Sequence, residues 1–128
     1  MTTFALMVQS SPLSSQNATT ALNFAKAAIA AGHRVLRVFF FHDGVICGDD
    51  RAGYPHNEPA TEWKALASEH GIDLVLCAPS ALRRGVVDEG QAARLGRQPT
   101  ATAPFALSGL GQWVEAAAAA DRVVTFGV

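Results

Sequence analysis

Apolar and polar residues follow two patterns that alternate along this chain. Short runs rich in apolar, β-branched and aromatic residues are typical of strands buried in a sheet, and they occur at residues 4–8, 35–41, 72–77 and 122–128. Between these runs, apolar residues recur every three or four positions, as in helices with one face toward a core. In the first such stretch, that face consists of Ala18, Leu22, Ala25 and Ile29.

Residues that begin or end helices set the expected boundaries. Glycine adopts the left-handed conformation that commonly ends a helix, which predicts helix ends at Gly32, Gly71 and Gly96. Small polar side chains cap first turns; the candidates are Ser15 or Asn17 for the first helix, Asp88 for a short helix over 88–95, and Ser108 for the last. A further helix opens at Glu58 and Pro59. Residues 42–57 and 97–106 are expected to be loops, and the first of these is the longest.

This order of strands and helices predicts the fold class. Strands that alternate with helices form a mostly parallel open sheet with helices on both faces, because parallel neighbours need crossover connections. The chain has 128 residues and a mass of 13.4 kDa, which is the usual size of one domain. We therefore expect a single three-layer α/β domain over residues 1–128.

Composition excludes several classes of function. The hydrophobic fraction of 49% and charged fraction of 16% indicate a compact soluble protein. Ten basic residues balance eleven acidic ones, and no basic run is longer than the Arg83–Arg84 pair, which argues against direct binding of nucleic acid or a membrane surface. The first residues lack the basic region of a signal peptide, and no apolar stretch reaches membrane-spanning length. A cytoplasmic location is expected.

Cys77 is the strongest candidate for chemistry. It closes the apolar run at 72–77, and Pro79 then suits the first turn of a following helix. The carboxyl ends of parallel strands are where open sheets bind ligands, and a helix start favours the thiolate over the thiol. Arg83 and Arg84 follow about one turn later and add positive charge. The alternative interpretation is a small, buried core cysteine, because cysteine is among the most buried residue types.

The remaining candidates have weaker patterns. His42 and Asp43 follow the second strand at the same sheet edge, where they could orient or deprotonate a substrate; an exposed turn is the alternative. Cys47 lies in the long loop, without the CxxC or Cys/His spacing of a disulfide, redox or zinc site. Residues 9–16 precede a helix start but lack the glycines of a nucleotide-binding loop. Gly109 and Gly111 weaken the start of the last helix unless a neighbour must approach it closely.

Several segments together resemble the DsrE/TusD family of sulfur-relay proteins. They are ALNFAKAAIAAGH at 21–33, RVFFFHDGV at 37–45, Cys77 followed by ALRRGVVDEG at 81–90, and SGLGQWVEAAAAADRVVTFG at 108–127. The resemblance implies a small DsrE-like α/β subunit in which Cys77 accepts sulfane sulfur as a persulfide and passes it on. It also implies that no metal or organic cofactor is required, and Arg83 and Arg84 would stabilise the persulfide anion.

The same resemblance implies partners and pathways. Family members are typically one of three related subunits in a heterohexamer and pass sulfur to a TusE/DsrC-like carrier, in tRNA 2-thiouridine synthesis or in dissimilatory sulfur oxidation. Two alternatives stay open from the residues alone. The chain could be a non-catalytic scaffold subunit with Cys77 in its core, or a flavin or nucleotide binder. Apolar residues on the last helix also make a homo-oligomer of the isolated chain an expectation.

Overall fold

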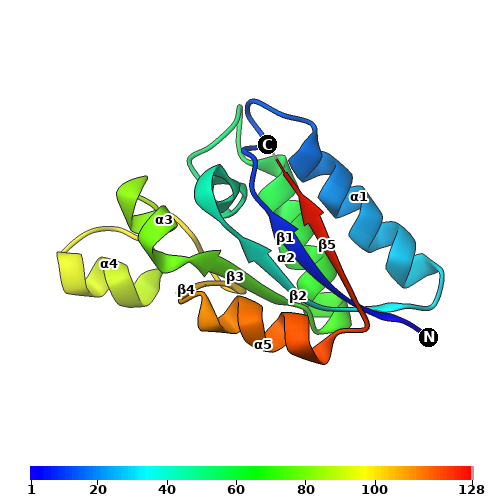
Figure 1. The fold of residues 1–128 in the computed structure, drawn as a ribbon. Helices are drawn as coiled ribbons and strands as arrows, with labels where there is room; N and C mark the ends of the chain where they lie inside the picture. The colour runs from blue at the N-terminus through cyan, green and yellow to red at the C-terminus, as the bar shows by residue number, and fades with distance from the viewer. Residues whose placement is uncertain (128) are drawn as a thin grey trace.

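Five strands form one sheet in which every neighbouring pair is parallel (Figure 1). The computed structural model describes residues 1–127, so Val128, the last residue of the expected fourth run, lies outside the described residues. The order across the sheet is β4-β3-β2-β1-β5. The strands are β1 (Thr3–Val8), β2 (Arg34–Phe40), β3 (Asp73–Cys77), β4 (Phe105–Ser108) and β5 (Arg122–Phe126).

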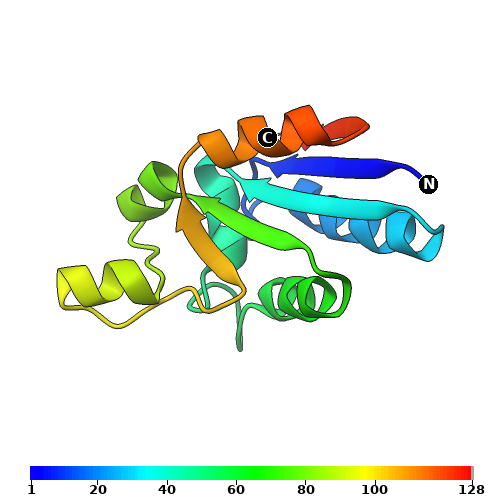
Figure 2. The same cartoon turned by 90° about the horizontal axis from the view of Figure 1, so that it is seen from below.

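Helices cover both faces of this sheet and make the expected three layers. Figure 2 shows α1 and α2 on one face and α5 on the other, while α3 and α4 extend beyond the end of β3. The helices are α1 (Asn17–Ala30), α2 (Glu58–His70), α3 (Ala78–Arg83), α4 (Glu89–Leu95) and α5 (Gly111–Ala119). The fold class predicted from the sequence is therefore confirmed.

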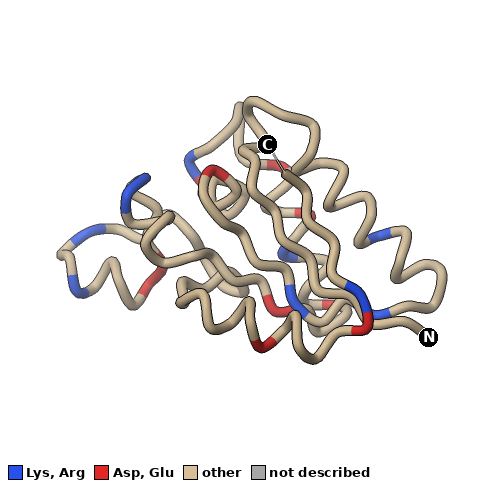
Figure 3. The backbone as a smooth tube through the Cα atoms, viewed as in Figure 1, with Lys and Arg blue, Asp and Glu red and all other residues tan. Residues whose placement is uncertain are grey.

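The core lies mainly between β1, β2 and β3 and the helices α1 and α2. Phe40 of β2 packs edge-on against Trp63 of α2 and Phe105 of β4, with ring centroids 5.5 and 5.6 Å apart. All three rings are almost completely buried. Figure 3 shows that charged residues are scattered over separate elements rather than gathered on one face. Among the described residues, no helix is long and apolar enough to cross a membrane.

One strand was not predicted. Residues 97–106 were expected to form a loop and Ser108 to cap the last helix, but β4 begins at Phe105 and pairs with β3 as far as Ser108 opposite Cys77. β4 has only four residues, and Phe105 is the only one of them that is buried. Its apolar run, Phe105 to Leu107, is too short to distinguish a strand from a loop. The last helix begins at Gly111, without a side-chain cap.

Most predicted helix boundaries are confirmed. Gly32, Gly71 and Gly96 have φ values of +86°, +66° and +65°, as expected for glycines that end helices. The Asp88 carboxylate accepts a hydrogen bond from the Gln91 N–H at 2.9 Å and caps α4. The start of α1 differs from expectation in that Gln16 occupies the cap position and its side chain makes no capping bond, while the predicted Ser15 accepts the Asn17 N–H at 3.1 Å through its hydroxyl. Likewise, the loop expected at 42–57 begins as a 3₁₀ helix, η1 (His42–Gly48).

Candidate functional site

Cys77 lies at the carboxyl end of β3, where the chain passes directly into α3. It is the residue before the first turn of α3, and Pro79 lies within that turn. Proline fits there because a first-turn N–H has no partner within the helix. The free thiol is buried, with 4% of the residue exposed. Its place in the fold is the one that the apolar run and the proline predicted.

A cavity of about 320 Å³ opens beside Cys77. It lies at the sheet edge where β2 and β3 end, and α3 and the residues before α5 form its other sides. It is lined by Phe41, His42, Cys77, Pro79, Ser80, Arg83, Arg84, Gly109 and Leu110. The structure thus brings together Cys77, Arg83 and Arg84, the three site residues named from the sequence. It also adds His42, which sequence reasoning placed at the same edge.

The two arginines have different surroundings. Arg84 Nε lies 3.0 Å from a carboxylate oxygen of Asp43, and its Nη1 donates to the Ser80 carbonyl at 3.0 Å. Two of its five N–H donors, and its charge, are therefore used within the chain. Arg83 is exposed and forms no ion pair with any of residues 1–127. Arg83 is consequently the cation at this cavity that is available to an anionic ligand.

His42 has an unusual backbone conformation. Its φ is +52°, the only positive value for a non-glycine residue in the described chain. Its backbone N–H donates to the hydroxyl of the buried Ser80 at 3.1 Å, and its ring packs edge-on against Phe41 at 4.4 Å between centroids. The side chain is exposed, as the turn interpretation predicted, yet it also lines the cavity that holds Cys77.

Cys47, the second cysteine, is not in the cavity that Cys77 lines. It is completely buried in η1, and its Sγ lies 3.9 Å from the Ser10 carbonyl oxygen. Burial raises the pKa of the Cys47 thiol to about 12, because the thiolate would lose its hydration. Both cysteines are free thiols in the structure. Cys47 is therefore held as an unreactive thiol near neutral pH.

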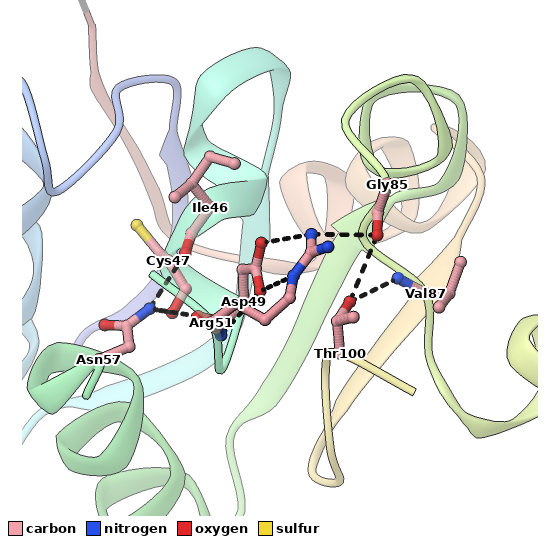
Figure 4. Close-up of polar contacts among 8 residues, drawn as sticks. All are labelled: Ile46, Cys47, Asp49, Arg51, Asn57, Gly85, Val87 and Thr100. Atoms are coloured by element: carbon pink, nitrogen blue, oxygen red, sulfur yellow. Dashed lines mark hydrogen bonds and ion pairs between the residues drawn. The ribbon is translucent and has the colours of Figure 1, made fainter. Parts of the chain in front are cut away.

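Polar contacts fix the segment that follows η1 (Figure 4). The Asn57 amide donates to the carbonyl oxygens of Ile46, Cys47 and Asp49 at 3.1, 3.4 and 2.8 Å. Arg51 bonds the Asp49 carboxylate through two nitrogens and also donates to the Gly85 carbonyl at 3.1 Å. Gly85 follows α3 directly, so this network joins the segment after η1 to the helix that carries Arg83 and Arg84.

Comparison with known proteins agrees with this fold. Residues 3–126, almost the whole chain, match the DsrE/DsrF-like family. The chain belongs to the DsrE/DsrF-like family. A TusD sulfurtransferase homologue of Pseudomonas aeruginosa is 44% identical over 91% of both chains, and the TusD sulfurtransferase of Serratia proteamaculans is 40% identical over 98% of this chain and 100% of its own. The DsrE protein of Allochromatium vinosum, whose name gives sulfurtransferase as a provisional activity, is 45% identical over 97% and 98%.

A solved structure shows the same fold for the DsrE/DsrF-like chain. The crystal structure of the ychN protein from E. coli superposes with a TM-score of 0.75, covering 98% of this chain and 100% of its own. The two sequences are 17% identical, so the comparison concerns the fold alone.

Five residues of the DsrE/DsrF-like cavity were not identified from the sequence as site residues: Phe41, Pro79, Ser80, Gly109 and Leu110. Ser80 follows a proline in a short helix and has no motif of its own. Gly109 could have been identified from the sequence, because a glycine near the start of a helix weakens that helix and so indicates another role. A Cβ at Gly109 or Gly111 would meet nothing within 4 Å, so packing within the described chain does not require either glycine. The absence of a side chain at Gly109 leaves room for a ligand to approach within the cavity.

Proposed function

We propose that this protein is a sulfurtransferase subunit that carries sulfane sulfur as a persulfide on Cys77 and passes it to a TusE/DsrC-like carrier protein. The observation that carries this proposal is the position of Cys77 in an open cavity that also contains Arg83 and Arg84. The names of the TusD and DsrE relatives, at 40–45% identity over most of the chain, support the same activity.

The proposed reaction is thiol–persulfide exchange in two steps. The Cys77 thiolate attacks the outer sulfur of a donor persulfide, so a new S–S bond forms at Cys77 while the donor S–S bond breaks and the donor leaves as a thiol. An acceptor thiolate then attacks the outer sulfur of the Cys77 persulfide in the same way. Each step exchanges one S–S bond for another and needs no external oxidant. Arg83 contributes positive charge beside the anionic persulfide, and Arg84 supports it from its ion pair with Asp43.

The proposal extends to partners and context. Related DsrE-like subunits would complete a heterohexamer, as the TusD and DsrE resemblance implies, and the whole chain would act as one DsrE-like domain in the cytoplasm. The sulfur would enter tRNA 2-thiouridine synthesis or dissimilatory sulfur oxidation. The names of the relatives give sulfurtransferase activity and do not choose between these contexts.

A scaffold role is the second candidate, and one observation favours it. Only 4% of Cys77 is exposed, a value usual for a core cysteine. In that case related subunits would hold the reactive thiol and this chain would complete the assembly. The cavity beside Cys77 argues for the carrier role, because a core cysteine has no need of an open space next to it.

Intact-mass measurement distinguishes the two roles. Purified wild type, Cys77→Ser and Cys47→Ser proteins are incubated with a persulfide donor and weighed before and after reductant. We expect one reductant-sensitive sulfur on wild type and on Cys47→Ser, and none on Cys77→Ser, because Cys47 is fully buried and its pKa is about 12. Equal loading of Cys77→Ser and wild type would refute the carrier role and establish the scaffold role.

A further inference from the structure

The Cys77 cavity is lined by one imidazole, that of His42, whose ring nitrogens can act as donor and acceptor. Of the described residues that line it, four are titratable or charged: Cys77 on β3, Arg83 and Arg84 on α3, and His42 on η1. Arginine does not give up its proton in proteins. The residues that reach the cavity from before α5, Gly109 and Leu110, carry no charge. The Cys77 proton has little access to bulk water, because the residue is 4% exposed.

His42 lies at this cavity with a positive φ, a backbone conformation that residues other than glycine rarely adopt. A positive φ is uncommon outside glycine, and it persists where the surroundings impose it, often at functional sites. Here the Ser80 hydroxyl accepts the His42 N–H at 3.1 Å. Ser80 belongs to α3, the helix that begins directly after Cys77. Cys77 and the backbone of His42 are thus both joined to the same short segment.

A second contact joins η1 to the end of α3. Asp43, the residue after His42, accepts a hydrogen bond from Arg84 Nε at 3.0 Å, and Arg84 also donates to the Ser80 carbonyl at 3.0 Å. Two consecutive residues of η1 are therefore each tied to α3, one through Ser80 and one through Arg84. Asp43 is also the acidic group nearest to His42 in sequence, and its charge is paired with Arg84. Two contacts therefore hold the backbone of His42 and Asp43 in place at the thiol cavity.

We propose that His42 moves the proton during sulfur exchange at Cys77, and that Ser80 is the positioning residue that holds His42 there. This inference rests on the proposed carrier function of Cys77. His42 accepts the Cys77 thiol proton as the thiolate attacks the outer sulfur of the donor persulfide. One S–S bond forms and one breaks, and the imidazolium then gives its proton to the departing donor thiolate. Atoms and charge balance without any further reactant.

Glycine is the informative replacement for His42. Glycine adopts φ near +52° without strain, so His42→Gly keeps the local backbone and leaves space where the imidazole was. The assay is single-turnover transfer of sulfur from a small-molecule persulfide, followed by intact mass between pH 6 and pH 10. His42→Gln is the space-filling variant. His56→Gly, at an exposed loop histidine, is the matched control.

The expected result has three parts. At pH 7, His42→Gly is slower than wild type by about 100-fold, at the lower end of the range for general acid–base catalysis. The deficit falls to about twofold at pH 10, because hydroxide is concentrated enough there to remove the thiol proton without a general base. Added imidazole restores the rate of His42→Gly at pH 7 but does not change that of His42→Gln or His56→Gly, because only the first has an empty site.

Ser80 is tested by a change that leaves the imidazole in place. Ser80→Ala removes the acceptor of the His42 N–H, so we expect a smaller deficit, about tenfold, with the same disappearance at alkaline pH. Ser80→Thr retains a hydroxyl and is expected to restore most of the rate. Thermal unfolding of each variant shows that the fold is intact. A Ser80→Ala deficit that is independent of pH would show a purely structural effect and refute the positioning role.

The outcomes separate the two proposals. Wild-type rates for His42→Gly at pH 7, or an equal loss at every pH that imidazole does not restore, would overturn the role of His42 while Cys77 still loads sulfur. Loading that is unaffected by Cys77→Ser would overturn the carrier function and, with it, this inference.

Discussion

Asn57 gives a sharp test of what fixes the segment after η1. The replacement Asn57→Ala removes four hydrogen bonds from a buried side chain. One of them caps α2, since Asn57 Oδ1 accepts the Ala60 N–H at 3.1 Å. The other three are donated by the amide nitrogen to the carbonyl oxygens of Ile46, Cys47 and Asp49. The replacement therefore removes the hydrogen bonds by which Asn57 joins η1 to the start of α2.

The size of the effect follows from these contacts. Loss of a cap costs about 1 kcal/mol of unfolding free energy. Each lost hydrogen bond to a carbonyl costs about 0.5–1.5 kcal/mol, with the lower figure for Ile46 and Asp49, whose carbonyl oxygens each keep a second partner. The sum is about 2–4 kcal/mol. For a domain of this size the midpoint of thermal unfolding should fall by about 6–20 °C.

Thermal and urea unfolding, followed by circular dichroism, measure the change. Asn57→Asp separates the cap from the amide donors, because aspartate caps helices as well as asparagine but cannot donate to three carbonyl oxygens. We expect Asn57→Asp to be destabilised at least as much as Asn57→Ala although it keeps the cap, because its carboxylate would be buried against three carbonyl oxygens with no donor between them. The matched control Asn23→Asp, at an exposed position on α1, should change the unfolding free energy by less than about 0.5 kcal/mol. Wild-type stability of Asn57→Asp would refute this reasoning.

Two further predictions concern the elements beside the cavity. A Cβ at Gly44 would lie 2.0 Å from the Val8 carbonyl oxygen, so Gly44→Ala should lower the free energy of unfolding, measured in urea, by about 3 kcal/mol or more. The control Gly111→Ala, where a Cβ has free space, should leave the free energy of unfolding unchanged. Equal stability of the two variants would contradict this prediction. Burial raises the Cys47 pKa to about 12, so the folded state keeps a proton that the unfolded chain loses near pH 9. The free energy of unfolding should therefore fall as pH rises from about 9 toward 12 in wild type, and fall more weakly in Cys47→Ala. If the free energy of unfolding had the same pH dependence in both proteins, this prediction would be wrong.

Local signals in the sequence were enough to place Cys77. The apolar run before it, the proline after it and the glycine that ends α2 each act within a few residues, and together they fix a buried strand that ends where a helix begins. The periodicity of α1 in the same way placed Ala18, Leu22 and Ala25 in the core, with Ile29 partly buried beside them. The three-layer parallel fold followed from the order of these elements, because parallel strands need crossover helices.

Short elements without a pattern of their own needed the tertiary structure. β4 has four residues and exists because its backbone pairs with β3. The start of η1 is likewise stabilised from outside, since the Ser80 hydroxyl and Arg84 hold His42 and Asp43 from residues 38 and 41 positions away in sequence. Nothing within the residues around His42 indicates those partners.

The sequence by itself therefore determined the fold class and the position of the thiol at the carboxyl edge of the sheet. Only the tertiary structure decided that Cys47 is buried while Cys77 lines a cavity, and that His42, Ser80 and Gly109 share that cavity with it. The physical reason is the separation along the chain between the residues that interact. Strand and helix boundaries depend on neighbours along the chain, whereas the cavity is formed by side chains from η1, β3, α3 and the residues before α5, which meet only when the sheet has assembled.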